Sequence, residues 1–159
     1  MKILLVNPPA RQPRQTTLMV PPLGLAYLAA VLRAAGYPVE VKDAFAEGLS
    51  WEAFADYLAA RRPEILGLTG ISPTIDTAFK AVRLARPYAQ TIIMGGPHVS
   101  VWGQEVFKQC PELDLGVVGE GEDTVVELAA ALARGTRRQA WPGSSARIFK
   151  APGGPCAKT

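Results

Sequence analysis

Histidine and cysteine are scarce in this sequence of 159 residues, which contains one histidine, His98, and two cysteines, Cys110 and Cys156. Two cysteines give neither a disulfide framework nor the ligand spacing of a metal-binding motif. No apolar run reaches the roughly 18 residues that a membrane-spanning helix needs, and the apolar start before Asn7 is too short for a signal peptide. The sequence therefore predicts a cytoplasmic protein without a membrane partner.

Acidic residues are absent from the end of the chain. All 14 Asp and Glu lie at or before Glu127, whereas five of the 17 Lys and Arg lie beyond Gly135. Residues 1–135 therefore carry 12 basic and 14 acidic side chains, a net charge of −2. Because a nucleic-acid-binding domain presents a basic face, we expect no nucleic-acid partner.

The segment 136–159 also lacks the periodic apolar pattern of the preceding sequence. It is basic and rich in glycine and proline, a composition typical of segments that do not fold on their own. We therefore predict one domain over residues 1–135. The tail over residues 136–159 is predicted to be disordered or a truncation scar.

Several common site signatures are missing. The sequence has no phosphate loop with a GK[ST] ending and no G-x-G-x-x-G after its first strand. It also has no nucleophile elbow. The first strand ends in Val6-Asn7-Pro8, without the acidic residues of a phosphorylated receiver domain. These absences argue against nucleotide binding, serine hydrolysis and phosphorelay signalling.

The sequence does contain a regular alternation of strand and helix patterns. Short apolar segments predict five strands: Lys2–Val6, Val39–Asp43, Ile65–Thr69, Thr91–Met94 and Leu113–Val118. The segments between them carry apolar residues at helical spacing, such as Leu25, Ala29 and Leu32. This alternation predicts an α/β fold of the flavodoxin-like (Rossmann-like) class: a doubly wound, five-stranded parallel sheet with helices on both faces. The alternating polarity of Val39–Asp43 places that strand near an edge.

Two segments depart from this regular pattern. Residues 10–21 form a polar, proline-containing loop after the first strand, and loops of this length are often functional. The fourth helix, expected over Val101–Cys110, is the weakest because Gly103 lies inside it.

Small residues follow three of the predicted strands, in Gly70–Thr74, Gly95–His98 and Gly119–Glu122. The carboxyl ends of parallel strands meet at one edge of a sheet, where open α/β sheets bind their ligands. The three loops therefore predict a narrow slot with bare backbone and the hydroxyls of Ser72 and Thr74. Such a slot suits a planar or extended ligand better than a bare phosphate.

With these loops in place, the sequence resembles the cobalamin-binding domain at the N-terminus of cobalamin-dependent radical SAM proteins. The pieces that carry the resemblance are Leu4–Pro9, Pro21–Ala29 with Gly36 and Asp43, Gly67–Thr74, Met94–His98 and Val117–Glu122. The resemblance covers residues 2 to about 134. It implies cobalamin as the cofactor, with the corrin ring over the carboxyl edge of the sheet. It also implies that the nucleotide tail lies between the third and fourth strands. The predicted cofactor-binding residues are Asn7, Pro8, Ser72, Thr74, Gly95, Gly96, Pro97, His98, Gly119, Glu120 and Gly121.

Two features differ from better-known cobalamin proteins. The loop after Pro8 has no histidine, so the resemblance implies base-off cobalamin without a protein imidazole on cobalt. The sequence also lacks the Cys-x-x-x-Cys-x-x-Cys motif that holds the iron–sulfur cluster in the radical SAM relatives. The cluster and S-adenosylmethionine would belong to a missing catalytic domain, in cis or in trans. We therefore expect this chain to be a non-catalytic fragment of a radical SAM methyltransferase or cyclase.

Some interpretations stay open at this point. We expect His98 to line the pocket rather than to ligate cobalt. We expect Glu122 and Asp123 to favour the positive end of the last helix, although Glu120 and Glu122 could form an acid–base pair. The alternative function is a flavodoxin-like sensory or interaction domain that binds another ligand, such as a flavin, or none.

Overall fold

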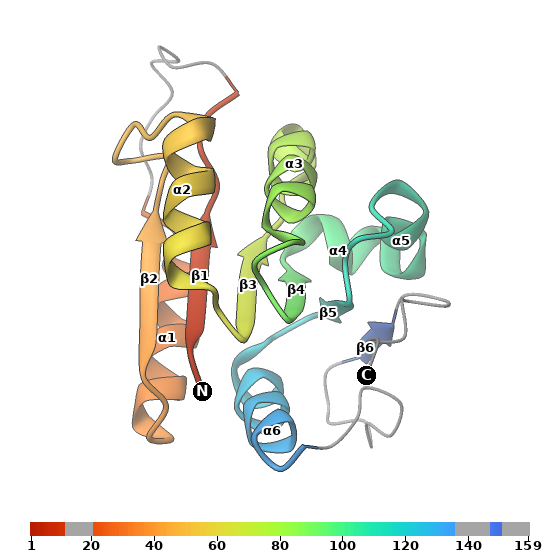
Figure 1. Ribbon diagram of the computed structural model, residues 1–159. Coiled ribbons are helices and arrows are strands. Elements are labelled where there is room, and N and C mark those ends of the chain that lie inside the picture. Colours follow the sequence, from red (N-terminus) through yellow and green to blue (C-terminus); the bar gives the residue numbers. More distant parts are fainter. Residues whose placement is uncertain (12–20, 136–146, 151–159) are drawn as a thin grey trace.

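The structure, a computed structural model, describes residues 1–11, 21–135 and 147–150. Six strands form one sheet in the order β2-β1-β3-β4-β5-β6 (Figure 1). The strands are β1 (Ile3–Asn7), β2 (Val39–Asp43), β3 (Ile65–Thr69), β4 (Thr91–Gly95), β5 (Leu115–Val118) and β6 (Arg147–Lys150). The first five are parallel, whereas β6 is antiparallel to β5. The predicted flavodoxin-like order is confirmed, and β2 is the edge strand that its alternating polarity predicted.

The number of strands differs from the prediction of five. Residues 147–150 lie in the predicted tail, yet Arg147 pairs with Val118 and Lys150 with Leu115. Between them, Ile148 packs against the buried cluster on one face of the sheet and Phe149 against that on the other. This part of the tail therefore covers the outer edge of β5. Residues 136–146 and 151–159 lie outside the described residues.

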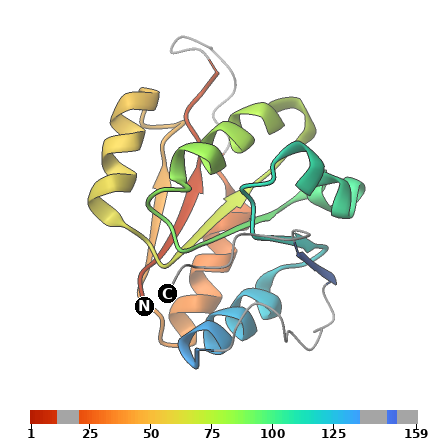
Figure 2. The same ribbon diagram turned by 45° about the vertical axis from the view of Figure 1, so that its right-hand side comes forward.

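Helices cover both faces of the sheet, as predicted, and Figure 2 shows the sheet between these two layers. One layer contains α1 (Leu23–Ala34) and α6 (Glu122–Ala133). The other contains α2 (Trp51–Arg61), α3 (Ile75–Ala85), α4 (Pro97–Trp102) and α5 (Val106–Gln109). Two short 3₁₀ turns, η1 (Ser72–Thr74) and η2 (Gly103–Glu105), precede α3 and α5. No helix in these described segments is long and apolar enough to cross a membrane.

The core follows directly from the strand and helix periodicities. In β1, Leu4 and Val6 point into one buried cluster, and Ile3 and Leu5 point into the other, because successive strand residues face opposite sides. Burying each such side chain stabilises the fold by about 1.5–3 kcal/mol.

The connection between β4 and β5 differs from the expected helix over Val101–Cys110. The chain becomes helical at Pro97, immediately after β4, and the helix breaks at Gly103. Gly103 has a φ of +53°, and a β-carbon there would lie 3.4 Å from Cε2 of Phe149. Because both the backbone angle and the contact with β6 favour glycine at this position, the predicted helix is split into α4, η2 and α5.

Candidate functional site

The loops after β3 and β4 are joined by main-chain hydrogen bonds at the carboxyl edge of the sheet. Thr69 pairs with Gly95 at the end of the two strands. The Gly70 amide then donates to the Gly95 carbonyl oxygen at 2.9 Å, and the His98 amide donates to the Gly70 carbonyl oxygen at 3.0 Å. The two small-residue loops therefore form one continuous backbone surface.

The two glycines at the end of β4 have different roles. Gly96 has a φ of +98°, and a β-carbon there would lie 2.8 Å from Oγ1 of Thr69 and 2.9 Å from the carbonyl oxygen of Gly70. At Gly95 the nearest atom to an added β-carbon would be the Val117 carbonyl oxygen, at 3.7 Å. The protein itself therefore requires glycine at position 96, whereas position 95 has room for a small side chain.

The third loop lies beside this surface. The Gly119 amide donates to the hydroxyl of Ser100 in α4 at 3.1 Å, which ties the end of β5 to the helix after β4. Gly119 has a φ of +79° with open space around it, and a β-carbon on Gly121 would lie 3.4 Å from Leu28 of α1. Glu120 is exposed between the two glycines. All three predicted loops thus border the same edge.

Glu122 and Asp123 occupy the first turn of α6. Carboxylates there are stabilised by the positive end of the helix dipole. This position supports the structural interpretation of Glu122 over its use in an acid–base pair.

His98 is the most enclosed polar side chain of the site, with 4% of its surface exposed. Its Nδ1 lies 3.0 Å from Oγ of Ser72, while Nε2 is buried without a hydrogen-bond partner among the described residues. The imidazole stacks on Trp102 at a ring distance of 5.8 Å and meets Phe79 edge-on at 6.0 Å. Burial lowers the pKa of His98 and so favours the neutral form of its ring.

The remaining predicted site residues differ in exposure and in whether their side chains already have hydrogen-bond partners. Ser72, Pro97 and Thr74 are exposed. The Asn7 side chain is already used, because its Nδ2 donates to Oδ1 of Asp43 in β2 at 2.8 Å, and Pro8 is buried beside it. The structure therefore brings Ser72, Gly95, Gly96 and His98 into one cluster and leaves Asn7 and Pro8 on the β2 side of the same edge.

An apolar surface at this edge was not predicted from the sequence. Among the described residues, the exposed large apolar side chains are Leu23, Tyr27, Ile71, Val101 and Trp102. Ile71 follows β3, Val101 and Trp102 lie in α4 after β4, and Leu23 opens α1. Val101 is 78% exposed. Exposed apolar surface of this kind often marks a binding site. The available signal was the apolar pair Val101-Trp102 next to Gly103, inside the helix expected over Val101–Cys110.

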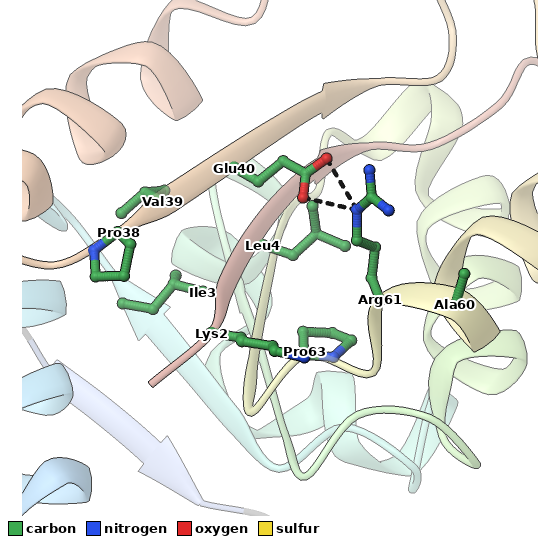
Figure 3. A pocket seen from close by; sticks show the side chains of 9 residues that line it. All are labelled: Lys2, Ile3, Leu4, Pro38, Val39, Glu40, Ala60, Arg61 and Pro63. Atoms are coloured by element: carbon green, nitrogen blue, oxygen red, sulfur yellow. Dashed lines mark hydrogen bonds and ion pairs between the residues drawn. The ribbon is translucent and has the colours of Figure 1, made fainter.

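A hollow of about 470 Å³ lies at the opposite edge of the sheet (Figure 3). Its walls come from the amino ends of β1 and β2 and the end of α2: Lys2, Ile3, Leu4, Pro38, Val39, Glu40, Ala60, Arg61 and Pro63. At its rim, Nε of Arg61 donates to both carboxylate oxygens of Glu40, at 2.9 and 3.1 Å. The Tyr57 hydroxyl donates to the same carboxylate, and burial raises the pKa of Tyr57 to about 12. None of the predicted site residues lines this hollow, and its Glu40 and Arg61 side chains pair with each other.

The carboxyl-edge site offers bare backbone, exposed apolar side chains, hydroxyls and one buried nitrogen without a partner. This set fits a ligand that is large, flat and apolar in one part and narrow and polar in another. Within residues 1–11, 21–135 and 147–150, no group of three or more His, Cys, Asp or Glu side chains could hold a metal ion.

Comparison with protein families matches residues 15–129 to the B12 binding domain. The curated relatives include an uncharacterised methyltransferase of Pyrococcus horikoshii, 37% identical over 139 residues, which cover 85% of this chain and 30% of the relative. They also include an anaerobic magnesium-protoporphyrin IX monomethyl ester cyclase of Rubrivivax gelatinosus, 34% identical over 118 residues, which cover 72% of this chain and 21% of the relative. The chain thus spans less than a third of the length of these relatives.

Solved structures share the fold. The radical S-adenosylmethionine methyltransferase TsrM from Kitasatospora setae, with cobalamin and a [4Fe-4S] cluster bound, superposes with a TM-score of 0.73 at 24% identity. The superposition covers 86% of this chain and 25% of TsrM. The cobalamin-dependent S-adenosylmethionine radical enzyme OxsB gives a TM-score of 0.72 at 19% identity, covering 94% of this chain and 22% of OxsB.

Proposed function

From the premise that this chain belongs to the family of B12-binding domains, we propose that it is the cobalamin-binding module of a larger radical SAM methyltransferase or cyclase. The single observation that carries this proposal is the carboxyl edge of the sheet. There, small-residue loops follow β3, β4 and β5, and the exposed apolar side chains Ile71, Val101 and Trp102 belong to the connections that leave β3 and β4. The family match gives no support to the alternative of a flavin-binding sensory domain.

Two groups of residues at this edge would contact different parts of the cofactor, the corrin ring and the nucleotide tail. The exposed side chains of Ile71, Val101 and Trp102 would support the apolar face of the corrin ring, because they otherwise leave apolar surface in water. The backbone of Gly95 and Gly119, with the hydroxyls of Ser72 and Thr74, would line the slot for the nucleotide tail. When bound, the corrinoid supplies a cobalt centre that can carry a methyl group, and the chain's own residues hold and orient it.

We propose that no histidine of this chain ligates the cobalt. The loop after Pro8 contains no histidine. The single histidine of the chain uses Nδ1 toward Ser72 and lies buried between Trp102 and Phe79. A ring held in this way would have to leave its aromatic neighbours to reach a metal above the sheet edge. This supports binding without a protein imidazole on cobalt, and the proposed slot for the nucleotide tail supports the base-off form.

The radical SAM chemistry is proposed to lie in a separate domain. This chain lacks the Cys-x-x-x-Cys-x-x-Cys motif and spans only 30% and 21% of the two curated relatives above. We infer that an iron–sulfur cluster and S-adenosylmethionine are bound by a further domain, in cis or in trans, that faces the corrin. A cytoplasmic location and the lack of nucleic-acid and membrane partners stay predictions from the sequence.

The test is retention of cobalamin by the purified chain. After incubation with hydroxocobalamin and gel filtration, we expect the corrin absorption bands to elute with the protein in a one-to-one ratio. A parallel incubation with flavin mononucleotide should leave the protein colourless. Elution of flavin with the protein, or of neither ligand, would contradict the proposal.

A further inference from the structure

Ser72 and His98 form a hydrogen-bonded pair that connects the interior of the site to its surface. Oγ of Ser72 and Nδ1 of His98 are 3.0 Å apart, although 26 residues separate them in the sequence. Ser72 is exposed in η1, whereas His98 is 96% buried in α4, since 4% of it is exposed. The pair therefore places a hydroxyl at the protein surface, and a hydrogen bond to the buried imidazole of His98 orients this hydroxyl.

The surroundings of His98 decide which of its nitrogens carries the proton. Nε2 is the one buried side-chain nitrogen or oxygen without a hydrogen-bond partner in the part of the chain that the structure describes. A proton on Nε2 would leave a buried N–H donor unpaired, which native proteins rarely tolerate. A proton on Nδ1 instead has an acceptor, the oxygen of Ser72. The neutral ring therefore carries its proton on Nδ1.

This tautomer also determines the role of Ser72. A serine oxygen that accepts from His98 keeps its own O–H free to donate elsewhere. The Ser72 hydroxyl has no second hydrogen-bond partner among the described residues. Its proton therefore points away from the imidazole, as a donor at the exposed end of the pair.

We propose that His98 is a positioning residue that makes the Ser72 hydroxyl a hydrogen-bond donor to an acceptor atom of the nucleotide tail of cobalamin. This inference rests on the proposed function, because it needs the tail to lie beside η1. It assigns His98 a role through Ser72, in place of direct contact with cobalt. It also distinguishes His98 from a core aromatic residue, which could pack against Trp102 and Phe79 equally well but could not orient the serine.

The first test needs no ligand. In the ¹⁵N-labelled apo protein, long-range ¹H–¹⁵N correlation spectra of the single histidine report which ring nitrogen is protonated. We expect the proton on Nδ1. A proton on Nε2 would overturn the inference, whether or not the protein binds cobalamin.

The second test measures affinity for hydroxocobalamin and for cobinamide, a corrinoid without the nucleotide tail. Loss of one hydrogen bond weakens binding by about tenfold. We expect Ser72→Ala and His98→Phe to lose about this factor for hydroxocobalamin and to keep their affinity for cobinamide. His98→Asn, whose side-chain amide can replace the Nδ1–H donor, should stay within about threefold of the wild-type chain.

Comparing the two corrinoids distinguishes a failure of the role of His98 from a failure of the proposed tail slot. Equal losses for both corrinoids in His98→Phe, or equal affinities of His98→Asn and His98→Phe for hydroxocobalamin, would overturn the role of His98. Equal affinity of the wild-type chain for cobinamide and hydroxocobalamin would instead contradict a bound tail, and with it the proposed tail slot. Melting temperatures of the apo variants identify any that fail to fold, and the spectrum of the wild-type protein then decides the inference alone.

Discussion

Gly96 approaches the backbone of Gly70 so closely that a β-carbon on Gly96 would lie 2.9 Å from the Gly70 carbonyl oxygen. Its neighbour Gly95 has no such contact, since an added β-carbon would meet nothing closer than 3.7 Å. The two glycines are adjacent in the sequence and would be treated as one ligand-binding pair on that basis. The structure shows that the fold itself requires glycine at position 96, whereas position 95 has room for a small side chain.

Gly96→Ala should destabilise the apo protein. The φ of +98° and the contacts with Thr69 and Gly70 together predict a loss of about 1–3 kcal/mol in the free energy of unfolding. Urea unfolding of the apo chain measures this loss. Gly24→Ala is the matched control, because Gly24 lies in α1 with nothing within 4 Å of an added β-carbon. An unchanged unfolding midpoint for Gly96→Ala would contradict the assigned role.

Gly95→Ala should retain the fold and lose cobalamin affinity. If the nucleotide tail lies against this backbone, one added methyl group causes overpacking of about 1–3 kcal/mol, a tenfold to hundredfold increase in Kd. Titration followed by absorbance gives the Kd, and the melting temperature of the apo variant shows that the fold is intact. Pro38→Ala, in the wall of the opposite hollow, should bind as the wild-type chain does. Equal affinity of a folded Gly95→Ala protein would place the tail elsewhere.

The bound cobalamin should show no protein nitrogen on cobalt. After reduction to cob(II)alamin, the electron paramagnetic resonance spectrum should lack nitrogen superhyperfine splitting on the cobalt lines. The physical reason is that His98 is committed to Ser72 and enclosed by Trp102 and Phe79. A splitting that disappears in His98→Ala would show that the imidazole does leave this position and bind the metal.

The Cys110 thiol should be unreactive in the folded protein. Burial, with a smaller effect of the Glu112 carboxylate, raises the pKa of Cys110 from its ordinary value of 9.0 to about 12. In a Cys156→Ser variant, which leaves Cys110 as the one thiol, iodoacetamide at pH 8.5 should modify the unfolded chain within minutes and the folded chain hardly at all. Mass spectrometry of native and urea-unfolded samples measures the difference. Rapid alkylation under native conditions would contradict the burial of this residue.

The same thiol predicts a pH dependence of stability. The folded-state pKa lies above the unfolded value, so the protonated thiol favours folding fully below about pH 9. This contribution is lost as the pH rises from 9 toward 12, by at most about 1.4 kcal/mol per pH unit. Urea unfolding of Cys156→Ser between pH 8 and 11 should therefore show a steeper loss than the same variant with Cys110→Ala. Parallel pH profiles for the two would contradict the raised pKa.

The sequence by itself determined the fold class and the place of the site. Buried parallel strands show apolar runs and helices show a 3.6-residue period, because each pattern records which side chains leave water. Small residues after β3, β4 and β5 predicted a binding site at the carboxyl edge of the sheet. The strand Arg147–Lys150 was not predicted, because its two apolar residues, Ile148 and Phe149, are too few to form a recognisable strand pattern.

Only the tertiary structure decided which contacts each residue of the candidate site makes. Whether a position requires glycine for the fold or leaves room for a ligand depends on the φ of the residue and on atoms from another strand. Neither can be predicted from the sequence around that glycine. In the same way, the hydrogen bond between Ser72 and His98 forms because parallel pairing brings the ends of β3 and β4 together. Local periodicity reports burial along one element, whereas such contacts depend on the packing of several elements. That packing gives Gly95, Gly96, Ser72 and His98 their different surroundings.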